Sequence, residues 1–129
     1  MIRTAQEEIE TILTTMTEIV NEYGRDYVYE KRWNPESRGG NGCHYVYNDE
    51  PDCLIGKVMI RAGWATIDEL KSIEGSRPNK DNKVWPRLTW PARGILLAAQ
   101  AAQDSGRTWG KALDKARFST KIQLESLQS

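Results

Sequence analysis

Cys43, His44 and Cys53 lie close together in the sequence and supply the soft and basic groups that could do chemistry. The two thiols are near enough for a disulfide across a turn, although a reducing cytoplasm keeps thiols reduced. All three side chains can bind Zn²⁺, but the segment offers no clear fourth ligand. Cys43 and His44 are also adjacent, and adjacent residues on a strand point to opposite faces. We therefore expect no bound metal.

A third chemistry needs one reactive thiol. If a helix begins near Cys53, its dipole stabilises the thiolate, and His44 is the one histidine that could act as a base. The alternative without chemistry is that both cysteines are small buried residues that pack a strand on a helix. We favour burial and keep Cys43, His44 and Cys53 as a candidate thiol site. Gly-x-Ser-x-Gly, His-x-x-x-His and Walker A patterns are absent from the sequence, so we do not expect an enzyme.

Residues 77–93 combine five cations with two indoles ahead of an expected helix N-terminus. Cations, flat aromatic faces and unpaired backbone N–H groups suit a ligand that carries phosphate and a base. The alternative is a solvated loop that two tryptophans pin to the core. The candidate ligand-binding residues are Arg77, Lys80, Lys83, Trp85, Arg87, Trp90 and Arg93.

The composition is that of one globular domain of 129 residues, with 39% hydrophobic and 28% charged residues and no net charge. The equal totals of basic and acidic residues hide an uneven distribution along the chain. Residues 1–75 carry 8 basic and 14 acidic side chains, and residues 76–129 carry 10 basic and 4 acidic ones. Either the two parts attract each other within the fold, or one face is basic and meets an anionic partner. No apolar run is long enough for a membrane span, and no signal peptide is evident.

The pattern of apolar residues predicts about five helices. Apolar spacing and a Thr4–Glu7 capping box predict the first helix over 5–23. A second helix is expected to start near Pro51 with Asp49 as its cap, and Thr66 caps a third. The predicted segments of the single domain are an acidic-faced helix (1–24), a β-ribbon with a glycine-rich loop (25–50), a helix pair (51–75), a basic loop (76–88), C-terminal helices (89–118) and a tail (119–129).

Residues 26–30 and 43–47 are rich in aromatic and β-branched side chains, which predicts two short strands that pair as a ribbon. All five tyrosines lie between Tyr23 and Tyr47. The loop Arg38–Gly42 lacks the strand and helix of a phosphate-binding turn, so we expect no nucleotide there. The helix pair after Pro51 resembles a helix-turn-helix, but its second helix is acidic and would be repelled by DNA phosphates.

Three stretches carry a resemblance to known proteins. They are Asp26-Tyr27-Val28-Tyr29, Cys43-His44-Tyr45-Val46 with Pro51-Asp52-Cys53-Leu54-Ile55-Gly56, and 98–113. Here the chain resembles small uncharacterised proteins of actinobacteria and of the tailed phages that infect them. The resemblance covers about two-thirds of the chain and implies no activity and no catalytic residue. It implies an origin as a phage or prophage accessory gene that works in the bacterial cytoplasm.

These patterns predict a compact, mainly helical α+β domain with one two-stranded β-ribbon and no cofactor. We expect a non-enzymatic accessory protein that binds a host or phage protein, or an anionic nucleotide-like ligand. The alternatives are a helix-turn-helix-like DNA-binding regulator and, behind it, a cysteine-dependent enzyme. A membrane is not an expected partner.

Overall fold

The computed structural model describes residues 3–30 and 44–128. In chain order the elements are α1 (Ala5–Tyr23), β1 (Val46–Tyr47), β2 (Glu50–Pro51), α2 (Leu54–Arg61), α3 (Ile67–Ser72), the short 3-10 helix η1 (Trp85–Arg87), α4 (Trp90–Asp104) and α5 (Trp109–Gln128). The predicted fold class is confirmed: in the described part of the chain, five α-helices accompany one antiparallel pair of strands.

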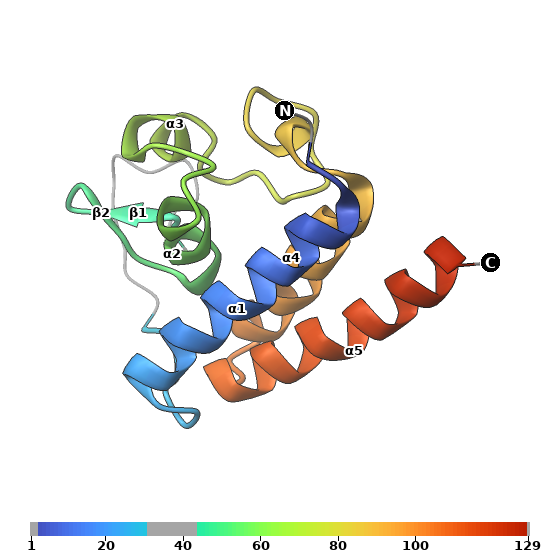
Figure 1. Ribbon diagram of the computed structural model, residues 1–129. Coiled ribbons are helices and arrows are strands. Elements are labelled where there is room, and N and C mark those ends of the chain that lie inside the picture. The colour runs from blue at the N-terminus through green and yellow to red at the C-terminus, as the bar shows by residue number, and fades with distance from the viewer. Residues whose placement is uncertain (1–2, 31–43, 129) are drawn as a thin grey trace.

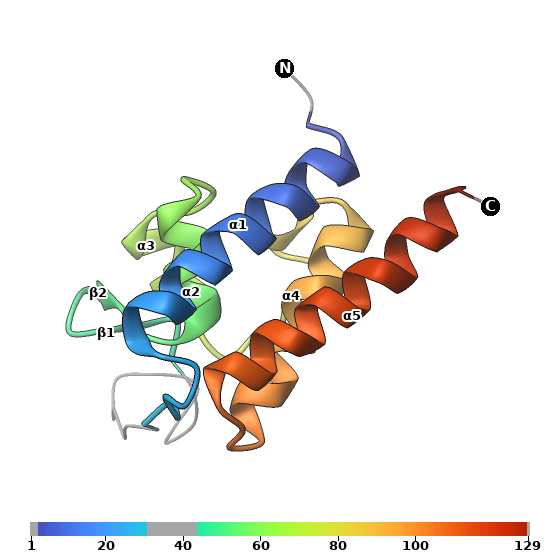
Figure 2. The same ribbon diagram turned by 60° about the horizontal axis from the view of Figure 1, so that its bottom comes forward.

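The helices pack around one hydrophobic core. α4 and α5 form a helical hairpin, and α1 lies along both (Figures 1 and 2). α2 packs on α1 and α4, and the small sheet and α3 sit on the far side of α2 (Figure 1). The largest fully buried side chains include Trp85 and Trp109. None of the helices in the described ranges has both the length and the apolar character needed to cross a membrane.

The helix ends follow local sequence signals. In the predicted capping box, the Glu7 amide donates to Thr4 Oγ1 over 3.1 Å and the Thr4 amide donates to Glu7 Oε1 over 3.0 Å. α1 ends at Gly24, whose φ of 94° favours glycine. The same reciprocal box with Thr66 opens α3. The sequence left the fate of residues 119–129 open, and α5 continues through them to Gln128.

The predicted pairing of 26–30 with 43–47 is wrong. β1 pairs instead with β2, which follows it after the two-residue turn Asn48–Asp49. Both turn residues have positive φ, 53° and 60°, which asparagine and aspartate tolerate better than most residues. Segment 26–30 contributes only an isolated bridge, from Val28 to Thr108. A tight turn between neighbours closes a much shorter loop than the predicted ribbon would have closed.

The second helix begins later than predicted. Pro51 lies in β2, and Cys53 rather than Asp49 is the N-cap, so α2 starts at Leu54. The first turn of α2 then passes close to the backbone of Tyr45, the residue before β1. A Cβ added at Gly56 would lie 2.2 Å from the Tyr45 carbonyl oxygen. Gly56 is therefore required by a close backbone approach.

Candidate binding surface and pocket

The predicted ligand-binding segment separates into residues that brace the fold and residues that face solvent. Arg93 belongs to the first group, because it is only 5% exposed. Its Nε donates to the Pro78 carbonyl over 2.7 Å, and its Nη2 donates to the Lys80 carbonyl over 2.8 Å. The guanidinium also lies 3.9 Å from the centre of the Trp90 ring. The expectation that Arg93 contacts a ligand from the surface is thus wrong, since it ties the loop before η1 to α4.

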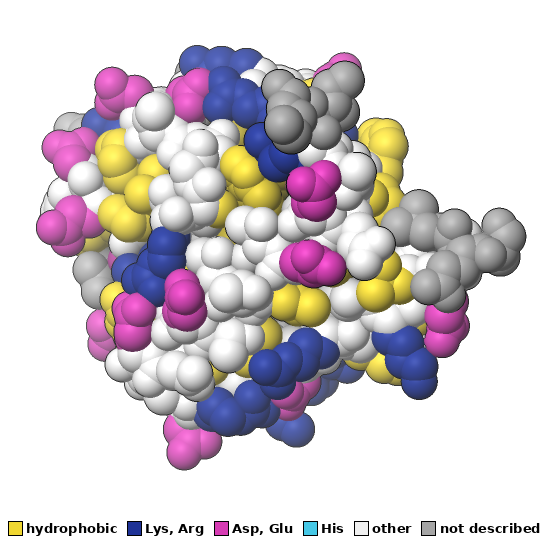
Figure 3. Space-filling model, in the orientation of Figure 1, with side chains coloured by type: hydrophobic (Ala, Val, Ile, Leu, Met, Phe, Trp, Pro, Cys, Tyr) yellow, Lys and Arg dark blue, Asp and Glu magenta, His cyan; other side chains and the backbone are white. Residues whose placement is uncertain are grey.

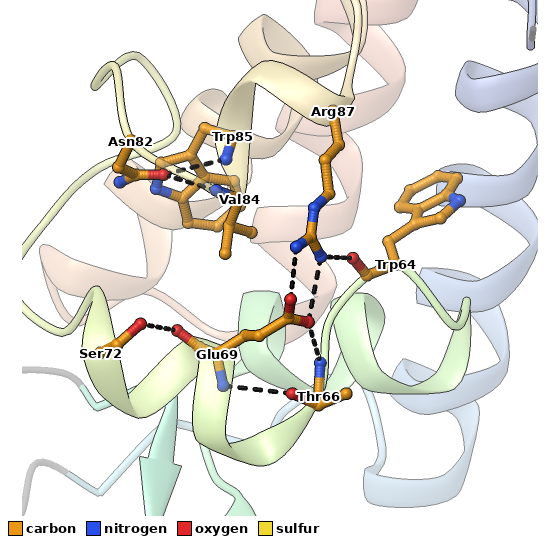
Figure 4. A network of polar contacts seen from close by, with 8 residues as sticks. All are labelled: Trp64, Thr66, Glu69, Ser72, Asn82, Val84, Trp85 and Arg87. Atoms are coloured by element: carbon orange, nitrogen blue, oxygen red, sulfur yellow. Dashed lines mark hydrogen bonds and ion pairs between the residues drawn. The ribbon is translucent and has the colours of Figure 1, made fainter.

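Arg87 is the second brace. Its guanidinium forms a two-pronged ion pair with Glu69 and donates to the Trp64 carbonyl over 3.0 Å (Figure 4). Glu69 also accepts the Thr66 amide over 2.9 Å as part of the α3 cap. The hydrogen bonds from Arg87 and from the Thr66 backbone lower the pKa of Glu69 to about 2. Arg87 therefore joins η1 to α3, and its head is committed to a carboxylate rather than to a ligand.

Trp85, one of the two tryptophans predicted as alternative stacking surfaces, is not accessible. Its side chain is fully buried, its indole Nε1 donates to Ser76 Oγ over 3.1 Å, and its ring meets the Tyr45 ring edge-on. The Asn82 side-chain oxygen accepts the amides of Val84 and Trp85 over 2.9 and 3.1 Å and fixes the turn into η1 (Figure 4). No base could stack on this indole without opening the core.

The N-terminus of α4 already holds an anion from the chain itself. Glu8 of α1 is buried, and its Oε1 accepts both the amide and the hydroxyl of Thr89 over 2.8 Å each. Arg3 faces the other carboxylate oxygen at 3.2 Å. Since the favourable field of a helix N-terminus extends over its first turn only, Glu8 occupies the place that an incoming phosphate would need.

Five of the predicted residues are exposed. Arg87 is one of them but is paired with Glu69, and we call the other four, Arg77, Lys80, Lys83 and Trp90, the Trp90 surface. Trp90 is 65% exposed, although Arg93 holds one side of its ring. Arg77 lies 3.9 Å from Asp104. Within the described residues, the side chains of Lys80 and Lys83 have no ion-pair or hydrogen-bond partner, and both are exposed. The segment therefore presents one rigid indole and uncommitted lysines on the loop that follows Pro78, whereas the head of Arg77 lies at Asp104, at the opposite end of α4 from Trp90.

The candidate thiol site is buried where the structure describes it. Cys53 caps α2 as predicted for a helix N-terminus, and its Sγ accepts the Gly56 amide over 3.4 Å. Cys53 and His44 are both fully buried, which confirms the burial expected for Cys53. The Cys53 amide donates to the His44 carbonyl over 3.0 Å. Cys43 lies outside the described residues. Among the described residues, no group of three His, Cys, Asp or Glu side chains could hold a metal ion.

A pocket that the sequence did not predict lies between the end of α1, the hairpin and α2. We call it the tyrosine pocket; its volume is about 200 Å³. It is lined by Tyr23, Tyr27, Tyr47, Asn48, Glu50, Pro51, Asp52 and Lys57. Three of the five tyrosines that gather between Tyr23 and Tyr47 line it, and this gathering is the one signal in the sequence that points to the pocket.

The proposed helix-turn-helix pair has its cations engaged. α3 is only six residues long, and its Lys71 pairs with Asp49 over 2.8 Å. Arg61 of α2 forms an ion pair with Glu22 over 2.6 Å. These pairs leave little positive charge for phosphates, and DNA binding by α3 stays a prediction without added support.

Charge is segregated on the surface as well as in the sequence. On the face in Figure 3, Lys and Arg side chains gather along the lower edge over α5, and Asp and Glu gather at the left edge. Within residues 3–30 and 44–128, two ion pairs, Arg25–Asp114 and Arg87–Glu69, join the acidic and basic parts of the chain. Some of the charges therefore pair inside the fold, and an anionic partner for the exposed basic areas stays a prediction.

A scan against protein-family models and searches of curated proteins and of solved structures found no match for this chain.

Proposed function

We propose that this protein is a non-enzymatic binding protein that docks an acidic surface of a partner protein on the Trp90 surface. The observation that carries the proposal is the 65% exposure of Trp90, whose indole is held in place by the buried guanidinium of Arg93. A rigid exposed indole loses little conformational freedom on binding, and tryptophan is among the residues that most often dominate protein interfaces.

The surrounding charge favours an acidic partner. Arg93 holds the Pro78 and Lys80 carbonyls, which fixes the backbone of Lys80 relative to the guanidinium that lies on the indole, and Lys83 follows on the same loop. Charges at the rim of an interface mainly steer the approach of a partner and add less to the final affinity. Trp90 is therefore the anchor of the proposed interface, and the lysines accelerate association.

The same geometry disfavours a nucleotide-like ligand. The two arginines best suited to hold phosphate in a forked geometry are committed, Arg87 to Glu69 and Arg93 to backbone carbonyls. Glu8 occupies the α4 N-terminus, and the second indole of the segment, Trp85, is buried. Phosphate recognition would have to rely on exposed lysines and Arg77 alone.

The partner would come from a bacterial host or a phage, and the protein would act as an accessory factor in the bacterial cytoplasm. This part of the proposal rests on the resemblance of the segments around Cys53 and 98–113 to actinobacterial and phage proteins. The buried position of Cys53 supports a binding role over thiol chemistry, because a nucleophile must be reached by its substrate.

The experiment is affinity capture from a bacterial lysate followed by binding kinetics with the purified partner. We expect Trp90→Ala to weaken binding at least about 30-fold, since hot-spot residues contribute about 2 kcal/mol or more. The matched control is Phe118→Ala, because Phe118 of α5 is 64% exposed and distant in sequence from the surface. It should change the dissociation constant less than about twofold.

Variants that remove charge separate the role of the lysines from that of Trp90. Lys80→Ala combined with Lys83→Ala should lower the association rate, and this loss should shrink at high salt while the dissociation rate changes little. Equal effects of Trp90→Ala and Phe118→Ala would overturn the proposal. Binding of ADP, polyphosphate or duplex DNA that depends on Trp90 would replace the partner protein by an anionic ligand.

A further inference from the structure

We propose that α1 and α5 form the interface of a symmetric dimer, in which α5 of each copy packs on α1 of the other. The two helices lie side by side in one layer (Figure 2). They run antiparallel, because Tyr23 at the end of α1 packs on Trp109 at the start of α5 with centroids 4.9 Å apart. Further along the layer, Nη2 of Arg117 donates to Thr17 Oγ1 over 3.4 Å. The proposed interface shares no residue with the Trp90 surface.

The outward side of α5 carries apolar side chains that nothing in the described structure covers. Phe118 is 64% exposed and Ile122 is 50% exposed, and their spacing of four places both on one side of the helix. Lys115 and Lys121 lie beside them. Both lysines are exposed, and neither has an ion-pair partner among residues 3–30 and 44–128. α5 therefore presents an apolar centre with a basic rim, which is how many protein interfaces are built.

The outward side of α1 has the opposite charge. Positions 4–22 contain no lysine and no arginine. Glu10 is exposed and accepts a hydrogen bond from the Gln6 side chain over 3.4 Å, and it faces no cation in the described structure. Glu18 is exposed as well and lies 4.0 Å from Arg61. Beside Glu10 lies a shallow hollow of about 400 Å³, lined by Glu7, Glu10, Thr11, Thr14 and Thr15.

The arrangement of the two helices suits a two-fold axis. Since α4 packs on the inner side of both α1 and α5, their outward sides face away from α4 together. A two-fold axis parallel to the helices then brings α5 of one copy onto α1 of the other, twice in the same dimer, and keeps the paired helices antiparallel. Such a self-complementary contact is the usual interface of homodimers.

The register of this contact follows from the hydrogen bond between Arg117 and Thr17. Four residues further along α5, Lys121 is level with the part of α1 between Glu10 and Thr14. Because a helix rises about 1.5 Å per residue, Glu10 of the second copy lies within about 5 Å of that level, which a lysine side chain can span. The hollow on α1 lies at the level of Ile122, so we expect this side chain to enter it.

The charge pattern favours a second copy over an extended polyanion. DNA or an anionic membrane on the lysines of α5 would also lie against the carboxylates of α1, which repel it. A second copy turned by the two-fold axis sets acidic residues against basic ones in both contacts. Each contact is about 28 Å long and about 10 Å wide, so the dimer buries about 1,100 Å² in total, and a specific interface needs about 1,000 Å².

The test is sedimentation velocity of the full chain. At about 100 µM we expect a species of twice the chain mass of 14.7 kDa, which dissociates toward about 1 µM as an interface of this small size should. Phe118→Ala should raise the dissociation constant of the dimer at least about tenfold, because a central aromatic side chain dominates such interfaces. Trp90→Ala is the matched control, since Trp90 of α4 is equally exposed, and it should change the constant less than about twofold.

Charge reversal tests the symmetry. Lys121→Glu and Glu10→Lys should each weaken self-association at least about fivefold, because each places like charges opposite one another in both contacts. An equimolar mixture of these two variants should restore the dimer to within about twofold, since every new glutamate then meets a new lysine. A chain that stays monomeric at all concentrations, a mixture no more associated than its components, or equal effects of Phe118→Ala and Trp90→Ala would each overturn the proposal. Binding of duplex DNA or anionic vesicles that depends on Phe118 would overturn it in favour of a polyanion.

Discussion

Replacing Arg93 by methionine tests whether this arginine, which the sequence predicts at the surface, stabilises the fold. Methionine keeps much of the length and apolar stem but leaves the Pro78 and Lys80 carbonyls without their donors at 2.7 and 2.8 Å. A hydrogen bond to a charged group contributes about 1.5–3 kcal/mol. Taking the lower end for each bond, because the Lys80 carbonyl is only partly buried, gives a loss of about 3 kcal/mol in the free energy of unfolding.

The free energy of unfolding is measured by urea denaturation, monitored by circular dichroism. For a chain of this size, 3 kcal/mol corresponds to a fall of roughly 12 °C in the midpoint of thermal unfolding. Lys83→Met is the control in the same loop, since it removes an exposed cation and should change stability by less than about 0.5 kcal/mol. A loss below about 1 kcal/mol for Arg93→Met, or the same loss in both variants, would refute the role of Arg93 as a brace.

Two further predictions concern the close helix approach and the acid stability. Gly56→Ala should cost about 3 kcal/mol or more in chemical denaturation, because its Cβ would lie 2.2 Å from the Tyr45 carbonyl oxygen. Gly94→Ala should instead gain about 0.5–1 kcal/mol, since its Cβ meets only a flexible side chain end, and a loss there would contradict this reasoning. The lowered pKa of Glu69 means that its pair with Arg87 stabilises the fold fully above pH 4.5 and is lost as the pH falls toward about 2. As the pH is lowered from 7 to 2, the urea midpoint should therefore fall less steeply in Arg87→Gln than in the unaltered chain. Parallel curves would show that the pair does not cause the loss of stability in acid.

Local signals predicted the parts of the fold whose causes are local. The bounds of α1 follow from Thr4, Glu7 and Gly24, all within or beside the helix itself. The sequence signal for the hairpin is equally local. The pair Asn48–Asp49 tolerates positive φ, and that signal could have predicted the turn that the structure shows. Residues 26–30 have side chains typical of strands, but their partner in the fold is Thr108 in an isolated bridge, which strand propensity alone does not indicate.

The candidate site was harder to predict because burial depends on distant neighbours. Trp85 and Trp90 each precede a proline and have an arginine two or three residues further on, so the sequence treats them alike. Tyr45 and Ser76 bury the first, whereas nothing in the described structure covers the outer side of the second. No spacing rule indicates that Arg93 would bond to carbonyls of the preceding loop. The sequence indicates segment 77–93 as a candidate site. Only tertiary packing distinguishes the residues that stabilise the fold from those that are accessible.

The contact between Glu8 and Thr89 spans 81 positions of the chain and sets an order of events during synthesis. A ribosome that adds about 5–20 residues per second needs several seconds to pass from one residue to the other. Until then the Glu8 carboxylate has Arg3 but lacks Thr89, and α1 has no α4 or α5 to pack on. α1 is therefore made well before the helices that secure it, so emergence of the α4–α5 hairpin, rather than growth of α1, times the completion of this core.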